Sequence, residues 1–297
     1  MLARLQQVLT FSLLGLAVGW LVWFYPTSPV LAWAGFVGIL LGYVVLLAVE
    51  FVLLRHVNQT DPAPPATAAD LFNAWLGEAL IAPIVFCWRQ PFKTNAYPDF
   101  IAPEKLAKGR RGVVFIHGFF CNRGFWNPWL QRLQGSGHAY VALSLEPVFG
   151  SIDEYTAQID AAVAQVTQAT GMPPLLVCHS MGGLAARAWL QTLQADARVH
   201  HIVTIGTPHH GTWLARFSHS LNGQQMRLAS GWQRGLDHNA PSQRPALFTC
   251  WYSNSDNIVF PVSTATLPGA QNRFIRGKAH VQMAFDLTLM SATLESL

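Results

Sequence analysis

Charged side chains are scarce in this sequence. They make up 11% of its 297 residues, whereas about a quarter of the residues in a typical soluble domain are charged. The mean hydropathy is +0.26, which is high for a water-soluble enzyme and excludes a disordered chain. The formal net charge of +4 is spread along the chain without a run of like charges, so nucleic acid is not expected as a partner.

Cysteine is also rare, with four residues in the whole chain: Cys87, Cys121, Cys178 and Cys250. No two of them form a Cys-x-x-Cys pair, which argues against zinc sites and thioredoxin-like redox sites. They are too sparse for a disulfide framework. The sequence therefore predicts neither a metal nor an organic cofactor.

Long uncharged stretches account for the high hydropathy. Leu5–Tyr25 and Val30–Val49 contain no charged residue, and each reaches the ~20 residues that a helix needs to cross a bilayer. The turn between them holds two helix-breaking prolines. Around it cluster aromatic residues of the kind that favour membrane interfaces: Trp20, Trp23, Tyr25 and Trp33. We therefore predict a transmembrane helical hairpin over residues 1–56. A signal peptide cleaved near Ala32 or Ala34 is disfavoured because the second stretch would still hold the chain in the membrane.

Arginines at the two ends of the hairpin indicate its orientation. Arg4 and Arg55 flank the uncharged stretches, and the turn has neither Lys nor Arg. The positive-inside rule then places both ends, and the rest of the chain, on the cytoplasmic side. Glu50, near the end of the second stretch, is expected to reach the membrane interface rather than to serve as a buried functional acid.

Residues 57–89 connect the hairpin to the rest of the chain. Residues 57–68 are rich in Pro, Ala and Thr, a composition typical of a linker. From Asp70 to Trp88, apolar residues recur at helical spacing. Such an amphipathic helix lies on a membrane surface or packs on the following domain, and packing, as the commoner arrangement, is slightly favoured.

From residue 90 to residue 297 the pattern is that of an α/β domain. Short apolar strands, typical of a buried parallel sheet, alternate with helical stretches. The expected strands are 112–116, 139–143, 174–178, 201–205 and 246–251, and the expected helices are 126–133, 151–170 and 182–193. This alternation predicts a doubly wound, mostly parallel sheet.

A strand that runs directly into a serine and then into a helix carries the main chemical signal. Leu175–Cys178 precedes His179 and Ser180, and Met181–Gly183 opens the helix. Such a sharp turn, the nucleophile elbow, lifts a serine hydroxyl out of the sheet. A serine before a helix is more often a simple N-cap, so the assignment depends on the other parts of the site. Cys178 stands where the elbow usually has a glycine, and its small side chain keeps the turn plausible.

The loop after the first strand supplies a second part. His117-Gly118-Phe119 follows it directly, and a glycine there allows a backbone N–H to point at the serine. We expect the amides of Phe119 and Met181 to form an oxyanion hole. Taken without the elbow, the same loop is an ordinary strand-ending turn with a surface histidine.

An acid and a base follow in the order that this architecture uses, Ser, then Asp, then His. Asp256 lies in the loop after the last expected strand, and His280 follows it near the end of the chain. Asp237 is the rival acid, but no strand delivers it to the site. Ser180, Asp256 and His280 are therefore the predicted catalytic residues.

These segments resemble the α/β-hydrolase superfamily, and in particular bacterial lipases and esterases. The resemblance is carried by Val113–Gly118, Cys178–Gly182 and Thr204–Thr212, the last containing Gly-Thr-Pro-His-His-Gly-Thr. It covers the chain from about residue 90 onward and does not include the hairpin. The resemblance implies a serine ester hydrolase and, with the hairpin, a two-pass protein of the bacterial inner membrane with a cytoplasmic catalytic domain.

A segment rich in apolar residues, 209–241, lies where such enzymes insert a lid. A packed helical insertion without a gating role explains the same pattern almost as well. We expect Phe120, His209 and Trp213 to line the substrate pocket.

Three functions remain open from the sequence alone. The leading one is a membrane-bound esterase or lipase acting on acyl esters or lipids. An acyltransferase or thioesterase uses the same residues with a different acceptor or ester. A noncatalytic membrane partner that keeps the fold is disfavoured, because it has no need of the Ser, Asp and His together. The sequence does not indicate the oligomeric state.

Overall fold

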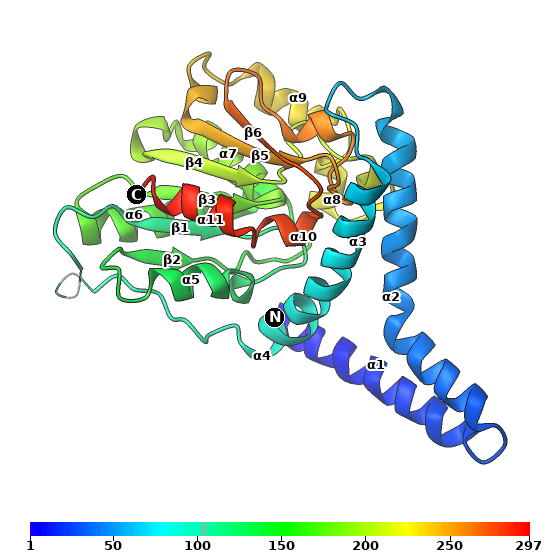
Figure 1. The fold of residues 1–297 in the computed structure, drawn as a ribbon. Helices are drawn as coiled ribbons and strands as arrows, with labels where there is room; N and C mark the ends of the chain where they lie inside the picture. The colour runs from blue at the N-terminus through cyan, green and yellow to red at the C-terminus, as the bar shows by residue number, and fades with distance from the viewer. Residues whose placement is uncertain (103, 105) are drawn as a thin grey trace.

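Six parallel strands form the sheet at the centre of the computed structural model (Figure 1), which describes residues 1–102, 104 and 106–297. Their order in the sheet is β2-β1-β3-β4-β5-β6, and every pairing between neighbours is parallel. The strands are β1 (Val113–Ile116), β2 (Tyr140–Ala142), β3 (Leu175–His179), β4 (His201–Ile205), β5 (Phe248–Ser253) and β6 (Gln271–Ile275). The predicted α/β sheet is thus confirmed, with β6 as a strand that the sequence pattern did not reveal.

Helices cover both faces of this sheet, because successive strand residues point to opposite sides. In β1, Val114 and Ile116 pack into one hydrophobic cluster with α6 and α7. Val113 and Phe115 pack into the other cluster with α5 and α11. These helices are α5 (Asn127–Leu133), α6 (Thr156–Thr170), α7 (Met181–Leu193) and α11 (Leu287–Leu294).

Short helices make up most of the connections within the domain. They are η4 (Arg123–Trp126), η5 (Ile152–Tyr155), η6 (Asp196–Arg198), η7 (Trp213–Phe217), α8 (Leu221–Gln225), α9 (Gly231–His238), η8 (Arg244–Leu247), η9 (Val262–Ala265) and α10 (His280–Met283). The segment 209–241 contains η7, α8 and α9. There, Asn222 donates a hydrogen bond to the carbonyl of Val148 at 2.9 Å, which ties α8 to the loop after β2.

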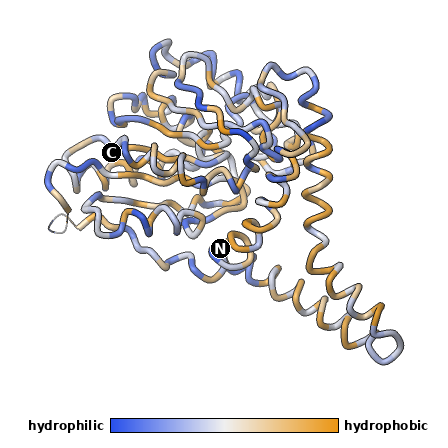
Figure 2. Tube along the Cα trace, in the orientation of Figure 1, coloured by the Kyte–Doolittle hydropathy of each residue, from blue (hydrophilic) through white to orange (hydrophobic). Residues whose placement is uncertain are grey.

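The N-terminal hairpin consists of α1 (Leu2–Phe24) and α2 (Pro29–Val57). Helix α1 and the first part of α2 extend away from the domain as an arm, and the rest of α2 runs beside α3 (Figure 1). Both are long and apolar enough to cross a membrane, and hydrophobic residues dominate the arm in Figure 2. At the turn, the Ser28 hydroxyl caps α2 by accepting from the amide of Leu31 at 3.3 Å. Trp20 closes the turn by donating to the Leu31 carbonyl at 3.1 Å.

The chain returns to the domain through η1 (Asn58–Thr60), α3 (Ala68–Pro83), a π-helical turn η2 (Ile84–Arg89) and α4 (Gln90–Phe92). Residues 68–92 are also apolar and long enough to span a membrane. In the structure, however, α3 lies between the domain and the last part of α2 (Figure 1). Trp75 donates to the Val44 carbonyl of α2 at 3.1 Å. The packing favoured by the sequence is therefore the arrangement found.

Candidate active site

Ser180 sits at a sharp turn between β3 and α7. Its backbone has φ 54° and ψ −128°, a positive-φ conformation that non-glycine residues adopt rarely and at a cost. Two hydrogen bonds hold the turn: the Ser180 amide donates to the Ile205 carbonyl at 2.9 Å, and the Thr207 hydroxyl donates to the Ser180 carbonyl at 2.8 Å. This geometry is that of the nucleophile elbow expected from the sequence.

The loop after β1 approaches Ser180 so closely that only a glycine fits at position 118. A Cβ added at Gly118 would lie 2.7 Å from the Ser180 Cβ, so a larger residue there would push the loop away from the serine. Cys178, at the unusual position of the elbow, is fully buried in the core. Burial raises the pKa of its thiol, so the thiol stays protonated and packs as a small apolar side chain.

His117 fixes the loop that carries the expected oxyanion donor. Its Nε2 accepts from the Leu145 amide at 2.9 Å, and its Nδ1 donates to the Gly118 carbonyl at 2.8 Å. Burial lowers the pKa of His117 to about 4, which keeps the ring neutral, as this donor and acceptor pattern requires. His117 is thus a buried structural residue rather than the surface histidine of the simpler interpretation.

The two expected oxyanion donors lie on either side of this turn. Phe119 follows Gly118 directly, and Met181 is the first residue of α7. The first amides of a helix have no carbonyl partner within the helix, so the Met181 N–H is available to a ligand.

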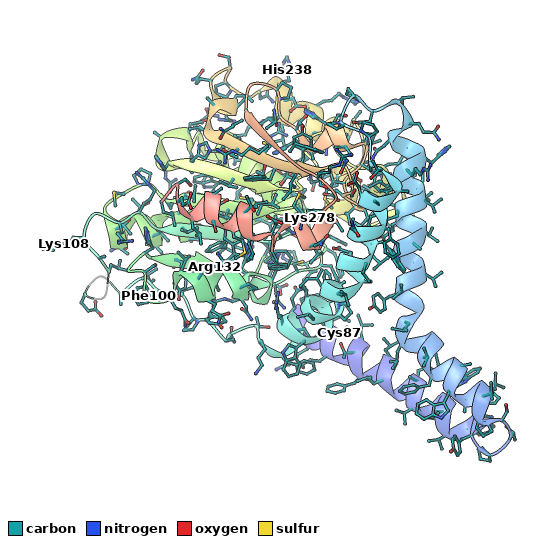
Figure 3. The ribbon with its side chains drawn as sticks, viewed as in Figure 1. Cys87, Phe100, Lys108, Arg132, His238 and Lys278 are labelled. Carbon is teal, nitrogen blue, oxygen red and sulfur yellow. The ribbon has the colours of Figure 1, made fainter. Side chains whose placement is uncertain are left out.

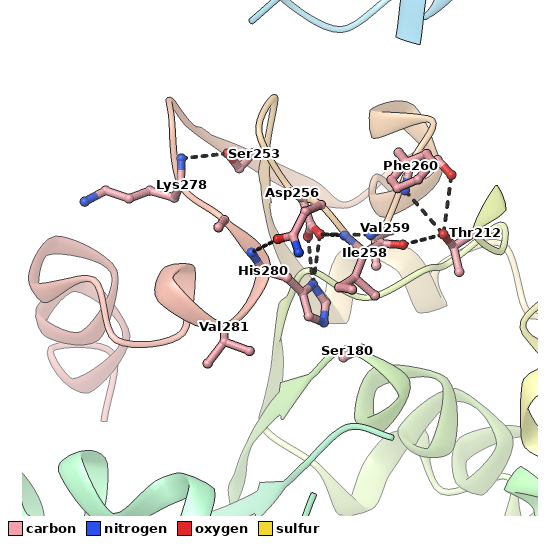
Figure 4. A network of polar contacts seen from close by, with 12 residues as sticks. Ser180, Thr212, Ser253, Asp256, Ile258, Val259, Phe260, Lys278, His280 and Val281 are labelled. Atoms are coloured by element: carbon pink, nitrogen blue, oxygen red, sulfur yellow. Dashed lines mark hydrogen bonds and ion pairs between the residues drawn. The ribbon is translucent and has the colours of Figure 1, made fainter. Parts of the chain in front are cut away.

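Asp256 and His280 form a close pair beside Ser180 (Figure 4). The Nδ1 atom of His280 lies 3.0 Å from each carboxylate oxygen of Asp256. The same carboxylate accepts from the amides of Ile258 at 3.0 Å and Val259 at 2.8 Å, which fixes its orientation. The imidazole ring extends toward Ser180.

Charge sets the protonation of His280. Burial by itself would lower its pKa, but the carboxylates of Asp256, Glu78 and Glu50 together outweigh burial, with Asp256 contributing most, and raise the pKa of His280 above its ordinary value. A Cβ on Gly206, which has φ 56°, would lie 2.9 Å from an Asp256 oxygen and 3.1 Å from His280 Nδ1. Glycine at this position therefore leaves room for the pair.

The rival acid, Asp237, lies elsewhere. It forms an ion pair with Arg187 at 2.5 Å and a longer one with His210 at 3.5 Å. Burial by itself would raise the pKa of Asp237, but His210 and Arg187 together lower it. Asp237 therefore anchors α9 to α7 and takes no part in the cluster around Ser180.

Two acids from the N-terminal helices support His280, and sequence reasoning missed both roles. Glu78 of α3 is 2% exposed and accepts from the amides of Val281 at 3.1 Å and Gln282 at 3.0 Å. It thereby caps α10, which begins at His280. Its signal in the sequence was a single acid within an apolar helical stretch.

Glu50 of α2 provides the second support, through Asn257. The Asn257 side chain donates to Glu50 at 2.6 Å and accepts from the His280 amide at 3.1 Å. Glu50 is thus half-buried against Asn257, whereas the sequence favoured a carboxylate that extends to the membrane interface. Its carboxylate instead turns toward the domain, where it has a hydrogen-bond donor.

Helix α1 reaches the oxyanion loop in a similar way. Gln6 is 2% exposed and donates to the Phe120 carbonyl at 3.3 Å. Its side-chain oxygen accepts from Asn122 at 3.5 Å, and the Asn122 amide donates to Gln90 at 2.6 Å. All three helical segments that precede the domain therefore contact the site.

A cavity of about 730 Å³ opens beside Ser180 and His280. Of the three residues expected to line the pocket, Phe120 does so. His209 and Trp213 lie outside this lining. His209 is fully buried, with Nε2 3.1 Å from the Thr204 hydroxyl, and Trp213 stacks on Phe260 with ring centres 6.0 Å apart.

Comparison with known proteins places this geometry in a family. The model of the alpha/beta hydrolase family matches residues 113–286, which is more than half of the chain. The chain belongs to the α/β-hydrolase family. The hairpin and α3 lie outside the matched region.

Individual relatives of this α/β hydrolase agree with that assignment. A triacylglycerol lipase of Burkholderia plantarii is 33% identical over 132 residues, which cover 41% of this chain and 36% of the lipase. The chain thus matches about a third of that relative's length. Among solved structures, the mature form of the Bacillus licheniformis lipase BlEst2 has a TM-score of 0.56 at 18% identity, covering 64% of this chain and 94% of the other. The propeptide form of the same lipase has a TM-score of 0.55 at 19% identity, with coverages of 64% and 51%. This α/β hydrolase is thus similar to lipases in part of its sequence and in its fold.

Proposed function

We propose that this α/β hydrolase is a membrane-anchored serine ester hydrolase that acts on acyl esters of lipid-like substrates. The observation that carries the proposal is the cluster of Ser180, Asp256 and His280 at one end of a large cavity (Figure 4). The serine occupies a strained elbow, and the histidine is held by the aspartate on its far side. This is the arrangement that nucleophilic acyl transfer requires.

The proposed reaction follows from these positions. The Ser180 hydroxyl attacks the ester carbonyl carbon and passes its proton to Nε2 of His280. Asp256 stabilises the imidazolium through Nδ1. The amides of Phe119 and Met181 stabilise the oxyanion, and the loss of one such donor typically costs about 10²–10³ in rate.

The second half of the reaction releases the acid. His280 returns its proton to the departing alcohol oxygen, and the acyl group remains on Ser180 as an ester. A water molecule then loses a proton to His280 and attacks the acyl-serine. The carboxylic acid leaves, and Ser180 regains its proton.

We further propose a bacterial inner membrane as the location, with two spans and a cytoplasmic catalytic domain. Both spans have the necessary length and apolarity, and many of their apolar side chains are exposed, including Trp23 at 77% and Val30 at 81%. Such a surface is unusual on a soluble protein. Arg4 and Arg55 flank the hairpin, which favours the cytoplasmic side for both ends.

A serine-reactive fluorophosphonate tests the proposed function. We expect the wild-type protein in membranes to be labelled at Ser180 and to hydrolyse p-nitrophenyl esters, and Ser180→Ala to lose both. Ser136→Ala is a matched control, because Ser136 lies on a loop and its hydroxyl contacts only local backbone, donating to the Leu133 carbonyl and accepting from the His138 amide. Full ester hydrolysis by a folded Ser180→Ala protein would overturn the proposal.

A further inference from the structure

The cavity beside Ser180 is walled mainly by the helices that precede the hydrolase domain. More than half of its lining residues fall between residues 10 and 87. Leu13 and Leu14 come from α1, Leu47 from α2, and Ala82 from α3. The segment 209–241, where a lid was expected, contributes none of the lining residues that the structure describes.

A proline in α3 ties two of these walls together. Pro83 has no N–H, so the carbonyl four residues earlier, Ala79, loses its donor within the helix. The Tyr43 hydroxyl of α2 donates to that carbonyl at 2.8 Å. Immediately after Pro83 the helix continues as the π-helical turn η2, which brings Phe86 and Cys87 to the cavity. Figure 3 shows Cys87 near the place where this turn meets α1. The walls are therefore joined by specific contacts.

Histidines are the only basic side chains in the described lining. Among the described lining residues there is neither Lys nor Arg. Its two acids, Glu50 and Glu78, face the His280 end and are engaged by Asn257 and by the amides after His280. The lining is otherwise mainly apolar, so its chemistry suits an uncharged hydrocarbon chain and not a phosphate group. The volume falls in the range of about 300–1,000 Å³ typical of ligand sites.

The rim of the cavity faces the part of the surface that a bilayer would cover. Leu13, Leu14 and Leu46 line the cavity and are also 39%, 44% and 67% exposed. They lie on the two helices whose outer sides are exposed and apolar, as the colours of Figure 2 also show. A chain inside the cavity can therefore leave it among lipid tails without crossing water.

We propose that α1, α2 and α3 form the acyl-binding pocket of this enzyme, and that the pocket receives the long acyl chain of a bilayer lipid ester directly from the membrane. The ester carbonyl lies at Ser180, and the hydrocarbon tail runs between α1, α2 and α3 toward the rim at Leu13, Leu14 and Leu46. This inference rests on the proposed function. It makes the hairpin a part of the active site as well as an anchor.

A photoreactive probe maps the pocket in the intact protein. The probe is a long-chain alkyl fluorophosphonate with a diazirine at the end of its alkyl chain, added to membranes that contain the full chain. Ser180 attacks phosphorus, fluoride leaves, and His280 takes the serine proton. Light then expels nitrogen from the diazirine, and the resulting carbene inserts into a neighbouring bond. We expect mass spectrometry to find the insertion sites within residues 10–50 or 82–87.

Insertion confined to residues 209–241, or found nowhere in the helical segments, would overturn the acyl pocket while leaving the serine chemistry intact. If Ser180 is not labelled at all and no ester is hydrolysed, the proposed function fails, and the pocket assignment fails with it. The two failures are therefore distinguishable in one experiment.

Chain-length selectivity gives an independent test. Leu47→Trp and Ala82→Phe add bulk inside the cavity, whereas Val45→Trp adds the same bulk on the exposed side of α2, where Val45 is 67% exposed. We expect each of the first two variants to lower kcat/KM for a p-nitrophenyl palmitate relative to a butyrate by about tenfold or more, since one extra methylene in a pocket already costs about 10–200-fold. The Val45→Trp control should keep the wild-type ratio.

Retained butyrate hydrolysis shows that a variant is folded, so the ratio is interpretable for each protein. An unchanged palmitate-to-butyrate ratio in both cavity variants would contradict the proposal. An equal drop of this ratio in the Val45→Trp control would also contradict the proposal, because the effect would then come from altered membrane insertion and not from the cavity.

Discussion

At the scale of single residues, the choice between two aspartates shows how local surroundings assign a role. Asp256 is 1% exposed and contacts His280 through both oxygens. Asp237 is paired with Arg187 and His210 at the edge of the segment 209–241. These two partners hold Asp237 away from His280, whereas Asp256 is in direct contact with it.

We expect Asp256→Asn to lower kcat by a factor on the order of 10⁴, because an amide in that place favours the wrong imidazole tautomer and cannot stabilise the imidazolium. Asp237→Asn is the matched control and should keep activity within about threefold, with a loss of stability because the buried Arg187 loses its charged partner. Steady-state hydrolysis of a p-nitrophenyl ester measures both. The reverse ranking of the two variants would show that the acid is Asp237.

The charge of His280 leads to a prediction about pH. Asp256 raises the pKa of His280 above its ordinary value of 6.5, although burial opposes this shift. The base must be neutral to accept the Ser180 proton, so kcat/KM should rise with pH and reach half of its maximum above 6.5. The contribution of the protonated His280–Asp256 pair to the stability of the folded protein changes with pH in the opposite direction to kcat/KM. This contribution is fully present below pH 6.5 and is lost as the pH rises through the raised pKa of His280.

This rise is measured as a pH profile of kcat/KM for the enzyme in membranes. Titration of the released acid gives the rate at each pH. A midpoint below 6.5 would mean that the desolvation of His280 outweighs Asp256, and the close geometry of the pair would then not hold in the working enzyme.

At the scale of elements, α10 depends on a neighbour for its position. It contains only four residues, His280–Met283, and its first amides cannot be satisfied within so short a helix. Glu78 of α3 accepts two of them. We therefore infer that Glu78 is a positioning residue, which holds the start of α10 and with it His280, the proposed base.

We expect Glu78→Ala to lower kcat by about 10–100-fold with little change in KM, since a displacement of about 1 Å at a reacting group costs about 10². Glu78→Gln keeps one acceptor oxygen and should recover a large part of that loss. Asp70→Asn is a control in the same helix, because Asp70 caps the start of α3 and pairs with Arg276. The positioning role of Glu78 would be contradicted if Glu78→Ala and Glu78→Gln both had the kcat of the wild type.

The elements themselves were unequally visible in the sequence. Five strands were found because buried parallel strands are short, continuous apolar runs. β6 escaped because it is an edge strand with the sequence Gln271-Asn272-Arg273-Phe274-Ile275, and none of its residues is fully buried. An edge strand pairs on one side only, so its residues need not be apolar.

At the scale of the whole molecule, the hairpin and the hydrolase domain share a site. Gln6 supports the oxyanion loop, Glu50 supports Asn257, and the two helices wall the cavity. Removal of the hairpin therefore removes more than a means of attachment.

We expect the full chain to remain in the membrane pellet after an alkaline carbonate wash, and deletion of residues 1–56 to release much of the protein. The released protein lacks Gln6 and Glu50 as well as two walls of the cavity, so it should lose about tenfold or more in palmitate hydrolysis. Any remaining reaction with a short-chain fluorophosphonate shows that it is folded. Protease added to spheroplasts should spare the domain of the full chain.

Release of the full chain by carbonate would contradict the two membrane spans. Digestion of the domain from the outer side would reverse the proposed orientation while leaving the anchor and the chemistry unchanged.

The sequence by itself determined the features that depend on local pattern. The nucleophile elbow at Ser180, the order of Asp256 and His280, the parallel sheet and the apolar hairpin all have signals within short windows. Each signal arises because backbone conformation and burial constrain neighbouring residues directly.

Only the tertiary structure decided which residues far apart in the sequence are in contact. Glu50 and Glu78 lie about two hundred residues from the segments that they support, and no local pattern records which donor a lone acid in an apolar helix will find. His209 and Trp213 belong to a segment typical of a lid, yet the cavity is closed by Leu13, Leu47 and Ala82 instead. Packing over the whole fold decides which element covers a site. The hydrophobic effect is non-directional, so any element of suitable shape can cover an apolar surface.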